Sequence, residues 1–529
     1  MGKPRIAVFT GPMPTIANTT PLVTGARSLR PQRLAAPVKV LVEAFSAHPL
    51  EAQAAHLYGP PDGWLDADGR LVAEEPAAGG TPVYEVELNP DDGLFLLPYV
   101  ARRADGRPWE SSAEPAAAAD TRQTFLPDAR RLYEEIERFE VGGDGRPVAL
   151  SALADFDFLR AAPGGGYPRD GERLGVDYFP YEPPHLVREP DLAALARITD
   201  QVQEAAATGR YAGLQWLESS ATVEETLYWL NLVIDTTLPI VGHAAQRSHR
   251  AIGYDGAKNI LDGVRFILSG VWADDGGRDR LGAVLIVDEI VLASREVTKI
   301  DARPGGYVAV GGHGGVVADL GAHWGPRLTY VPERRHTATS ELRLPLLPNE
   351  VDAVKGDLAT GVRRTRLATK DADGRLVGPA MPRVSLVPFG HFAETELGPD
   401  EQAAPDAGVI GQVERALARG GLAGLVVEGM VPYGSTDPAV DRALRIATCA
   451  GIPVVRVGRG HPGGMVFRRD PWAIAGDNLT ANKARMLLTA ALLRLGALPP
   501  ARDPLAPTDA ECTAIRARLR DFQYIFDTH

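Results

Sequence analysis

The chain has 529 residues, of which 45% are apolar and 23% charged, and this balance excludes a disordered chain, a fibre and a single small module. Acidic residues outnumber basic ones by 68 to 56, and a net charge of −12 argues against nucleic acid as a partner. Cys449 and Cys512 are the two cysteines and form no CxxC pair, which argues against a disulfide framework and suits a reducing cytoplasm.

The N-terminal segment predicts a buried first strand rather than a targeting signal. Its apolar run, Ile6 to Phe9, is shorter than the roughly 7 to 15 residues that a signal peptide requires. No run of about 18 apolar residues occurs elsewhere in the sequence, so no membrane segment is predicted. We therefore expect a cytoplasmic protein without a membrane partner.

From residue 210 onward, short apolar runs alternate with amphipathic helical stretches. This alternation predicts an α/β fold with mostly parallel sheets. The clearest helices are Thr222 to Asp235, where Thr222 and Glu225 have the spacing of a capping box, and Asn259 to Leu268. The predicted strands are Gly213 to Leu217, Pro239 to Gly242, Ala283 to Val287, Val384 to Val387, Leu422 to Val427 and Pro453 to Val457.

Composition suggests two unequal α/β domains. A polar stretch rich in Pro and Gly, Lys370 to Pro382, separates a larger N-terminal domain, residues 1–382, from a smaller C-terminal domain, residues 383–529. Residues 25–175 contain Ala/Pro/Gly-rich passages and one clear alternating strand, Val83 to Leu88. We interpret this region as an insertion in the larger domain.

Several motifs are more typical of loops and turns than of cofactor, anion or metal sites. Gly458 to Gly463 matches GxGxxG, but Pro462 and the residues after it do not open a helix, so a loop is predicted. The glycine run Gly311 to Gly315 is more typical of a turn before a strand at Val316-Val317 than of an anion site. The histidines lack HExxH spacing, so neither a metal nor another cofactor is predicted.

An aromatic loop, Asp177 to Pro184, contains Tyr178, Phe179 and Tyr181. Such side chains line pockets, but they also anchor loops against a core. Both interpretations stay open for this segment.

Four segments carry a more specific signal because they occur in a particular order and setting. Thr10 to Asn18 follows the first strand directly, and Glu218 to Thr226 lies at a strand-to-helix turn. Gly253 to Asn259 and Ser294 to Lys299 come next. Together they resemble the bacterial-type L-asparaginase/glutaminase family, over residues 1–24 and about 176–529. The insertion has no counterpart in that family.

The resemblance implies an amidohydrolase with a threonine nucleophile. Thr15 matches the nucleophile of the family's TGGTIA motif, although Pro12-Met13-Pro14 stands where one Gly is expected. Ser220 falls in the second motif, HGTDTxEET, and Lys299 matches the catalytic lysine of the GRxVTK-like strand. An alcohol is a weak nucleophile until a base activates it, so a neutral Lys299 acting through Ser220 would take the proton of Thr15.

Further landmarks and binding residues follow from the same resemblance. Asp255, Gly256 and Asn259 fit the family pattern aDGxxN, and the segments Arg335 to Thr337 and Asn482 to Arg485 also match. Ser219 is the predicted substrate contact of the second motif, and the aromatic loop falls near the family's carboxylate-binding segment. The predicted substrate-binding residues are Ser219, Tyr178, Phe179 and Tyr181.

Ala221 is the main departure from the family pattern, because the family has there an Asp that binds the α-amino group of the substrate. Its loss favours a less polar amide or lactam over free asparagine. The alternative is a catalytically inactive binding or regulatory protein on an asparaginase scaffold. Family members assemble as dimers of dimers, so a homodimer or homotetramer is expected.

Overall fold

The computed structural model describes residues 2–11, 36–42, 60–68, 70–88, 133, 136, 149–160, 191–247, 253–301, 306–309, 315–321, 325–390, 404–459, 466 and 470–529. The chain forms two compact units. Unit 1 comprises Met1–Glu189, Trp216–Ser220 and His243–Val264. Unit 2 comprises Pro190–Gln215, Ala221–Gly242 and Arg265–His529.

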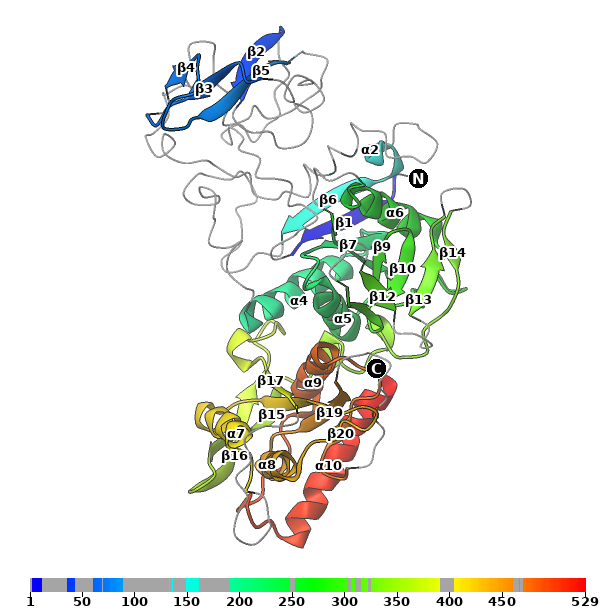
Figure 1. Cartoon of the computed structure of the whole chain (residues 1–529). Helices are drawn as coiled ribbons and strands as arrows, with labels where there is room; N and C mark the ends of the chain where they lie inside the picture. The colour runs from blue at the N-terminus through cyan, green and yellow to red at the C-terminus, as the bar shows by residue number, and fades with distance from the viewer. Residues whose placement is uncertain are drawn as a thin grey trace. The chain divides into compact units, whose positions relative to one another are not determined.

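Unit 1 contains a parallel strand pair and a small antiparallel sheet. Strand β1 (Arg5–Thr10) runs parallel to β6 (Asp155–Arg160), and the two lie side by side in Figure 1. Ile6 to Phe9 are buried, which confirms the predicted first strand. The antiparallel sheet has the order β2 (Val38–Val42), β5 (Thr81–Leu88), β3 (Gly63–Leu65), β4 (Leu71–Val72), and the predicted strand at 83–88 lies in β5.

Unit 2 contains a mixed sheet of parallel and antiparallel strands. Strand β8 runs parallel to β9, and the strands from β9 to β14 pair antiparallel. The division between the units passes through β7 and β8, whose last residues belong to unit 1. The strands are β7 (Gly213–Leu217), β8 (Ile240–His243), β9 (Val284–Val287), β10 (Ile290–Ala293), β13 (Val316–Asp319) and β14 (Arg327–Leu328).

Helix α5 (Val223–Val233) is the most deeply buried helix of this region, with Tyr228 and Trp229 fully enclosed. Trp229 Nε1 donates a hydrogen bond of 2.8 Å to Thr199 Oγ1, which links α5 to α4 (Leu192–Ala207). A Cβ atom at Gly242 in β8 would lie 2.2 Å from Leu227 Cδ1, so glycine lets α5 approach the sheet closely. The predicted helices are confirmed as α5 and α6 (Gly256–Ser269).

Unit 2 also holds a four-stranded, fully parallel sheet whose strands follow in chain order (Figure 1). They are β17 (Arg383–Pro388), β18 (Ala423–Gly429), β19 (Val454–Gly458) and β20 (Ile474–Ala475). Connections between adjacent parallel strands are right-handed, which places the crossover helices on one face. The crossover helices are α7 (Ala407–Arg419) and α8 (Pro438–Cys449), whereas α9 (Ala481–Leu495) and α10 (Asp509–Thr528) follow β20.

Two hairpins accompany these sheets. Strands β15 (Glu350–Asp357) and β16 (Gly361–Ala368) pair antiparallel, and β15 packs on α7 and α9. The shorter hairpin joins β11 (Val297–Lys299) to β12 (Tyr307–Ala309) and carries Lys299 at the end of its first strand.

The α/β fold class predicted from the sequence is confirmed, since one sheet is fully parallel and the other mixed. The limits 1–382 and 383–529 and the insertion over 25–175 stay predictions. Among the described residues, no helix is long and apolar enough to cross a membrane.

The close approach of α5 to β8 gives a direct stability test. Gly242→Ala introduces a methyl group against buried Leu227, so we expect the free energy of unfolding to fall by about 1–3 kcal/mol in urea titrations. Gly390→Ala is the matched control, because a Cβ atom there meets no atom within 4 Å. Equal stability of the two variants would contradict the packing described for Gly242.

Candidate active site

The end of β1 lies beside the end of β7 in unit 1. The backbone N–H of Gly11 donates a hydrogen bond of 2.8 Å to the carbonyl of Leu217. A Cβ atom at Gly11 would come within 2.6 Å of the Trp216 ring, so only glycine fits here without rearrangement. The first and second motif segments therefore start next to each other. Thr15 itself lies outside the described residues.

The turn after β7 contains the predicted hydroxyl groups. Glu218 is buried, its carboxylate accepts a hydrogen bond of 2.5 Å from Trp216 Nε1, and its backbone N–H donates to the carbonyl of His243. These contacts hold the turn against the neighbouring strand end. Ser219, which follows, is buried, and Ser220 is half-buried. The aromatic residues Tyr178, Phe179 and Tyr181 lie outside the described residues.

The Asp255–Asn259 landmark orders the chain after β8. The Asp255 carboxylate accepts hydrogen bonds from the backbone N–H groups of Gln246 and Arg247 at 2.9 to 3.1 Å. Asn259 Nδ2 donates to the carbonyl of Ala244 at 2.9 Å. Both side chains thus support the backbone at this strand end.

The predicted capping box at the start of α5 is wrong, although the helix does begin after Thr222. The Thr222 side chain forms no capping hydrogen bond. The reason is that the Glu225 carboxylate binds the guanidinium of Arg485 at 2.5 Å instead of reaching back to the helix start. Glu225 thus forms a long-range ion pair with Arg485 and not the local capping box with Thr222.

Glu224 holds the strand that carries Lys299. Its Oε2 accepts a hydrogen bond of 2.8 Å from the backbone N–H of Lys299, and its Oε1 lies 3.4 Å from Thr298 Oγ1. Glu224 stands in the first turn of α5, directly after the Ser219-Ser220-Ala221 turn. The carboxylate therefore fixes β11 to the beginning of α5.

Lys483 reinforces this arrangement from α9. Its ammonium group is buried and donates to the carbonyls of Glu224, at 2.8 Å, and of Ser294. It also lies 5.3 Å from the centre of the Tyr228 ring, a distance suited to a cation–π contact. Burial lowers the pKa of Lys483 to about 8, with opposing contributions from nearby carboxylates.

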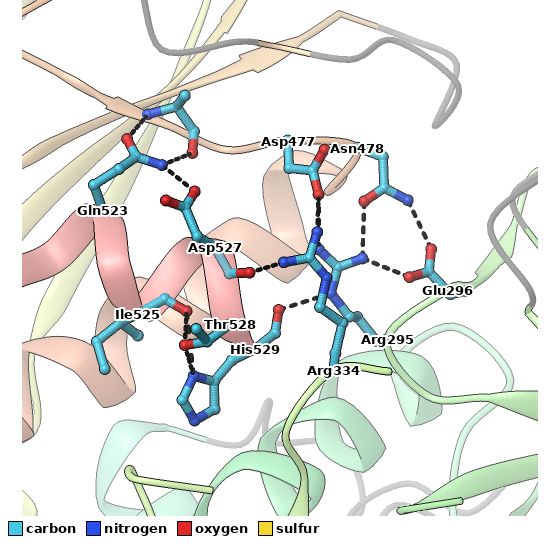
Figure 2. Close-up of polar contacts among 11 residues, drawn as sticks. Arg295, Glu296, Arg334, Asp477, Asn478, Gln523, Ile525, Asp527, Thr528 and His529 are labelled. Atoms are coloured by element: carbon cyan, nitrogen blue, oxygen red, sulfur yellow. Dashed lines mark hydrogen bonds and ion pairs between the residues drawn. The ribbon is translucent and has the colours of Figure 1, made fainter. Parts of the chain in front are cut away.

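The segment before β11 forms a second polar network, drawn in Figure 2. Buried Arg295 donates to Glu296 Oε1 at 2.5 Å, to Asn478 Oδ1 at 2.8 Å and to the main-chain oxygen of His529 at 2.8 Å. Asn478 Nδ2 in turn donates to Glu296 Oε2 at 2.7 Å. The network ties the segment that leads to Lys299 to the loop before α9 and to the end of α10.

Known asparaginases are similar to this chain in sequence. A sequence model described as Asparaginase, N-terminal, matches residues 188–306. Glutaminase-asparaginase of Pseudomonas fluorescens biotype A is 24% identical over 310 residues, 57% of this chain and 69% of the relative. The glutaminase-asparaginase of Acinetobacter glutaminasificans is 23% identical over 315 residues, 58% of this chain and 77% of the relative. Residues 188–306 thus match the asparaginase family model, and the longer alignments make the chain similar to asparaginases at low identity.

Two further matches are a curated L-asparaginase and a solved structure. L-asparaginase 2 of Escherichia coli K12 is 24% identical over 273 residues, which is 51% of this chain and 63% of that protein. The crystal structure of a probable cytoplasmic L-asparaginase from Campylobacter jejuni is 17% identical, with a TM-score of 0.47, covering 72% of this chain and 93% of that one.

The asparaginase sequence model covers the positions of Ser219, Ser220 and Lys299. The sequence alone assigned no role to Glu224, which anchors the Lys299 backbone, or to Lys483, which donates to Glu224. Glu224 and Lys483 stand within matched landmarks, and their contacts became apparent in the folded chain. One signal was available for Lys483, namely a lysine on the otherwise apolar buried side of a helix. Among the described residues, no group of three His, Cys, Asp or Glu side chains could hold a metal ion.

Glu224→Gln tests the anchoring of Lys299. An amide has a single acceptor oxygen and no charge, so the free energy of unfolding should fall by about 1–3 kcal/mol. Hydrogen–deuterium exchange at the β11 peptide should also become faster, because the Lys299 N–H loses its carboxylate partner. Glu350→Gln, at an exposed position of β15, is the control. Unchanged exchange in β11 would show that Glu224 does not anchor this strand.

Proposed function

We propose that this asparaginase-family chain hydrolyses the carbon–nitrogen bond of an amide, with Thr15 as nucleophile and with Ser220 and Lys299 relaying its proton. The relatives it matches are named as glutaminase-asparaginases and L-asparaginases. The hydrogen bond from Gly11 to Leu217 supports the proposal most directly. It joins the start of the segment that leads to Thr15 to the start of the segment that carries Ser220.

The proposed reaction proceeds in two steps. Thr15 Oγ attacks the amide carbonyl while its proton passes through Ser220 to the neutral amine of Lys299. Backbone N–H groups at the turns hold the developing oxyanion, and the leaving nitrogen departs with a proton returned by Lys299. Water then attacks the acyl-threonine ester, which releases the carboxylic acid and regenerates the hydroxyl.

The proposed substrate is an amide or lactam less polar than free asparagine. Ala221 stands at the position of the carboxylate that, by the family resemblance, binds a substrate ammonium group. A methyl group offers that ammonium neither charge nor hydrogen bond, so a zwitterionic substrate would lose a principal contact. Ser219 and the aromatic side chains Tyr178, Phe179 and Tyr181 are the proposed substrate contacts.

The same observation favours a second candidate, a binding or regulatory protein without hydrolytic activity. A protein that has lost hydrolytic activity is expected to lack functional side chains of its enzymatic relatives, and Ala221 lacks the family carboxylate. This protein would bind an amide without forming a covalent bond to it. Assembly as a homodimer or homotetramer and a cytoplasmic location are proposals that either candidate accommodates.

Amide turnover by site variants tests the hydrolase. The panel comprises primary amides, cyclic amides and asparagine, and release of ammonia or amine is measured. We expect a less polar amide or lactam to be the preferred substrate. Thr15→Ala and Lys299→Met should each reduce kcat by at least about 1,000-fold, because nucleophile and base act as one unit.

Matched controls separate chemistry from folding. Thr513→Ala, on the exposed side of α10, and Lys355→Met, on the exposed side of β15, should keep wild-type turnover. Turnover restricted to asparagine would refute the proposed substrate class. Wild-type activity in Thr15→Ala would refute the nucleophile.

A further inference from the structure

A cavity of about 280 Å³ lies in unit 2 beside the segment that leads to Lys299. Its walls include the stretch Ala293–Glu296 before β11, the residues around Arg334, and the loop residues Asp477 and Asn478 before α9. Several of these side chains appear in Figure 2. The volume accommodates a small organic molecule, and Ser219, Ser220 and Lys299 are not among its described lining residues.

The positively charged groups of this cavity already have acceptors. Arg295 binds Glu296, Asn478 and the main-chain oxygen of His529, as described above. Arg334 donates to Asp477 Oδ2 at 2.7 Å and to the main-chain oxygen of Asp527. Both guanidinium groups are thus engaged within the protein.

Other polar atoms of the cavity wall, by contrast, still have hydrogen-bonding capacity that no described residue uses. Ser294 is 1% exposed, lines the cavity, and its Oγ has no hydrogen-bond partner. Both arginines bind Oδ2 of Asp477, which leaves Oδ1 for another donor. Glu333, also in the wall, forms no ion pair with any described residue. The unused capacity of the cavity therefore consists of one neutral hydroxyl, which can donate or accept, and of oxygens on two negatively charged carboxylates.

The imidazole in the cavity wall does not change this balance. His336 lines the cavity, and burial lowers its pKa to about 4, so the ring is neutral at physiological pH. The three carboxylates Glu296, Glu333 and Asp477 thus face two guanidinium groups. A ligand that supplies one positive charge would bring the cavity to neutrality.

We propose that this cavity binds a small molecule with a primary ammonium group on a short carbon chain. An ammonium has three N–H donors and no acceptor, which complements Ser294 Oγ, Asp477 Oδ1 and the Glu333 carboxylate. A carboxylate ligand would face Glu333 and Asp477 without an unengaged cation to bind it. Lys299 is not among the residues that line the cavity, and binding there can be measured without any amide turnover.

Titration calorimetry of the full chain with 1,5-diaminopentane tests the proposal, with glutarate as the five-carbon dianion control at matched ionic strength. The diamine should bind saturably and glutarate should not. Glu333→Gln should weaken diamine binding about tenfold, the effect of losing one charge-assisted hydrogen bond. Glu414→Gln, on the exposed side of α7 and away from the cavity, should leave the affinity unchanged.

Ser294→Ala adds an independent readout. The Oγ has no partner, so its removal should leave the thermal unfolding midpoint unchanged or higher while it weakens diamine binding. Three results would each overturn the proposal: no saturable diamine binding, equal binding of glutarate, or an affinity that Glu333→Gln does not alter. The readout is binding, so loss of amide turnover and loss of this site are observed separately.

Discussion

A buried ammonium group joins the elements around the proposed catalytic lysine. Lys483 is 2% exposed and donates to main-chain oxygens of Glu224 and Ser294. A buried charge is stable only when it is hydrogen-bonded. Lys483 reaches both oxygens only if α9 packs in one register against α5 and the turn before β11. The Glu224 carboxylate then binds the Lys299 N–H, and the position of a proposed catalytic group depends on the packing of a distant helix.

Much of the fold could be predicted because its strands are buried on both faces. Strands β7 and β19 read as mainly apolar runs with one polar residue each, Gln215 and Arg456, which is typical of parallel sheets covered by helices. The hairpin of β15 and β16 could not be recognised in this way, since Arg363, Arg364 and Arg366 interrupt the apolar pattern on its outer strand. Its stability comes from packing of β15 on α7 and α9.

The candidate site was predictable only in part, because some of its side-chain contacts join residues that lie far apart in the sequence. Motif order singled out Ser219, Ser220 and Lys299, but it says nothing about which side chains support them. Lys483 reaches Glu224 across 259 residues, and Arg485 reaches Glu225 across 260. The second pair also explains why the local capping box failed, because a nearby guanidinium binds the Glu225 carboxylate more strongly than a backbone N–H does.

The proposed hydrolysis rests on covalent chemistry at Thr15, in a chain that has Ala221 where the family resemblance implies a carboxylate. The most direct measurement is intact-mass analysis of the full chain after incubation with an activated ester of a less polar acid, followed by peptide mapping. The account predicts one acyl adduct, located on Thr15 and absent from Thr15→Ala. An adduct on Ser219 or Ser220, or no adduct after prolonged incubation, would contradict it.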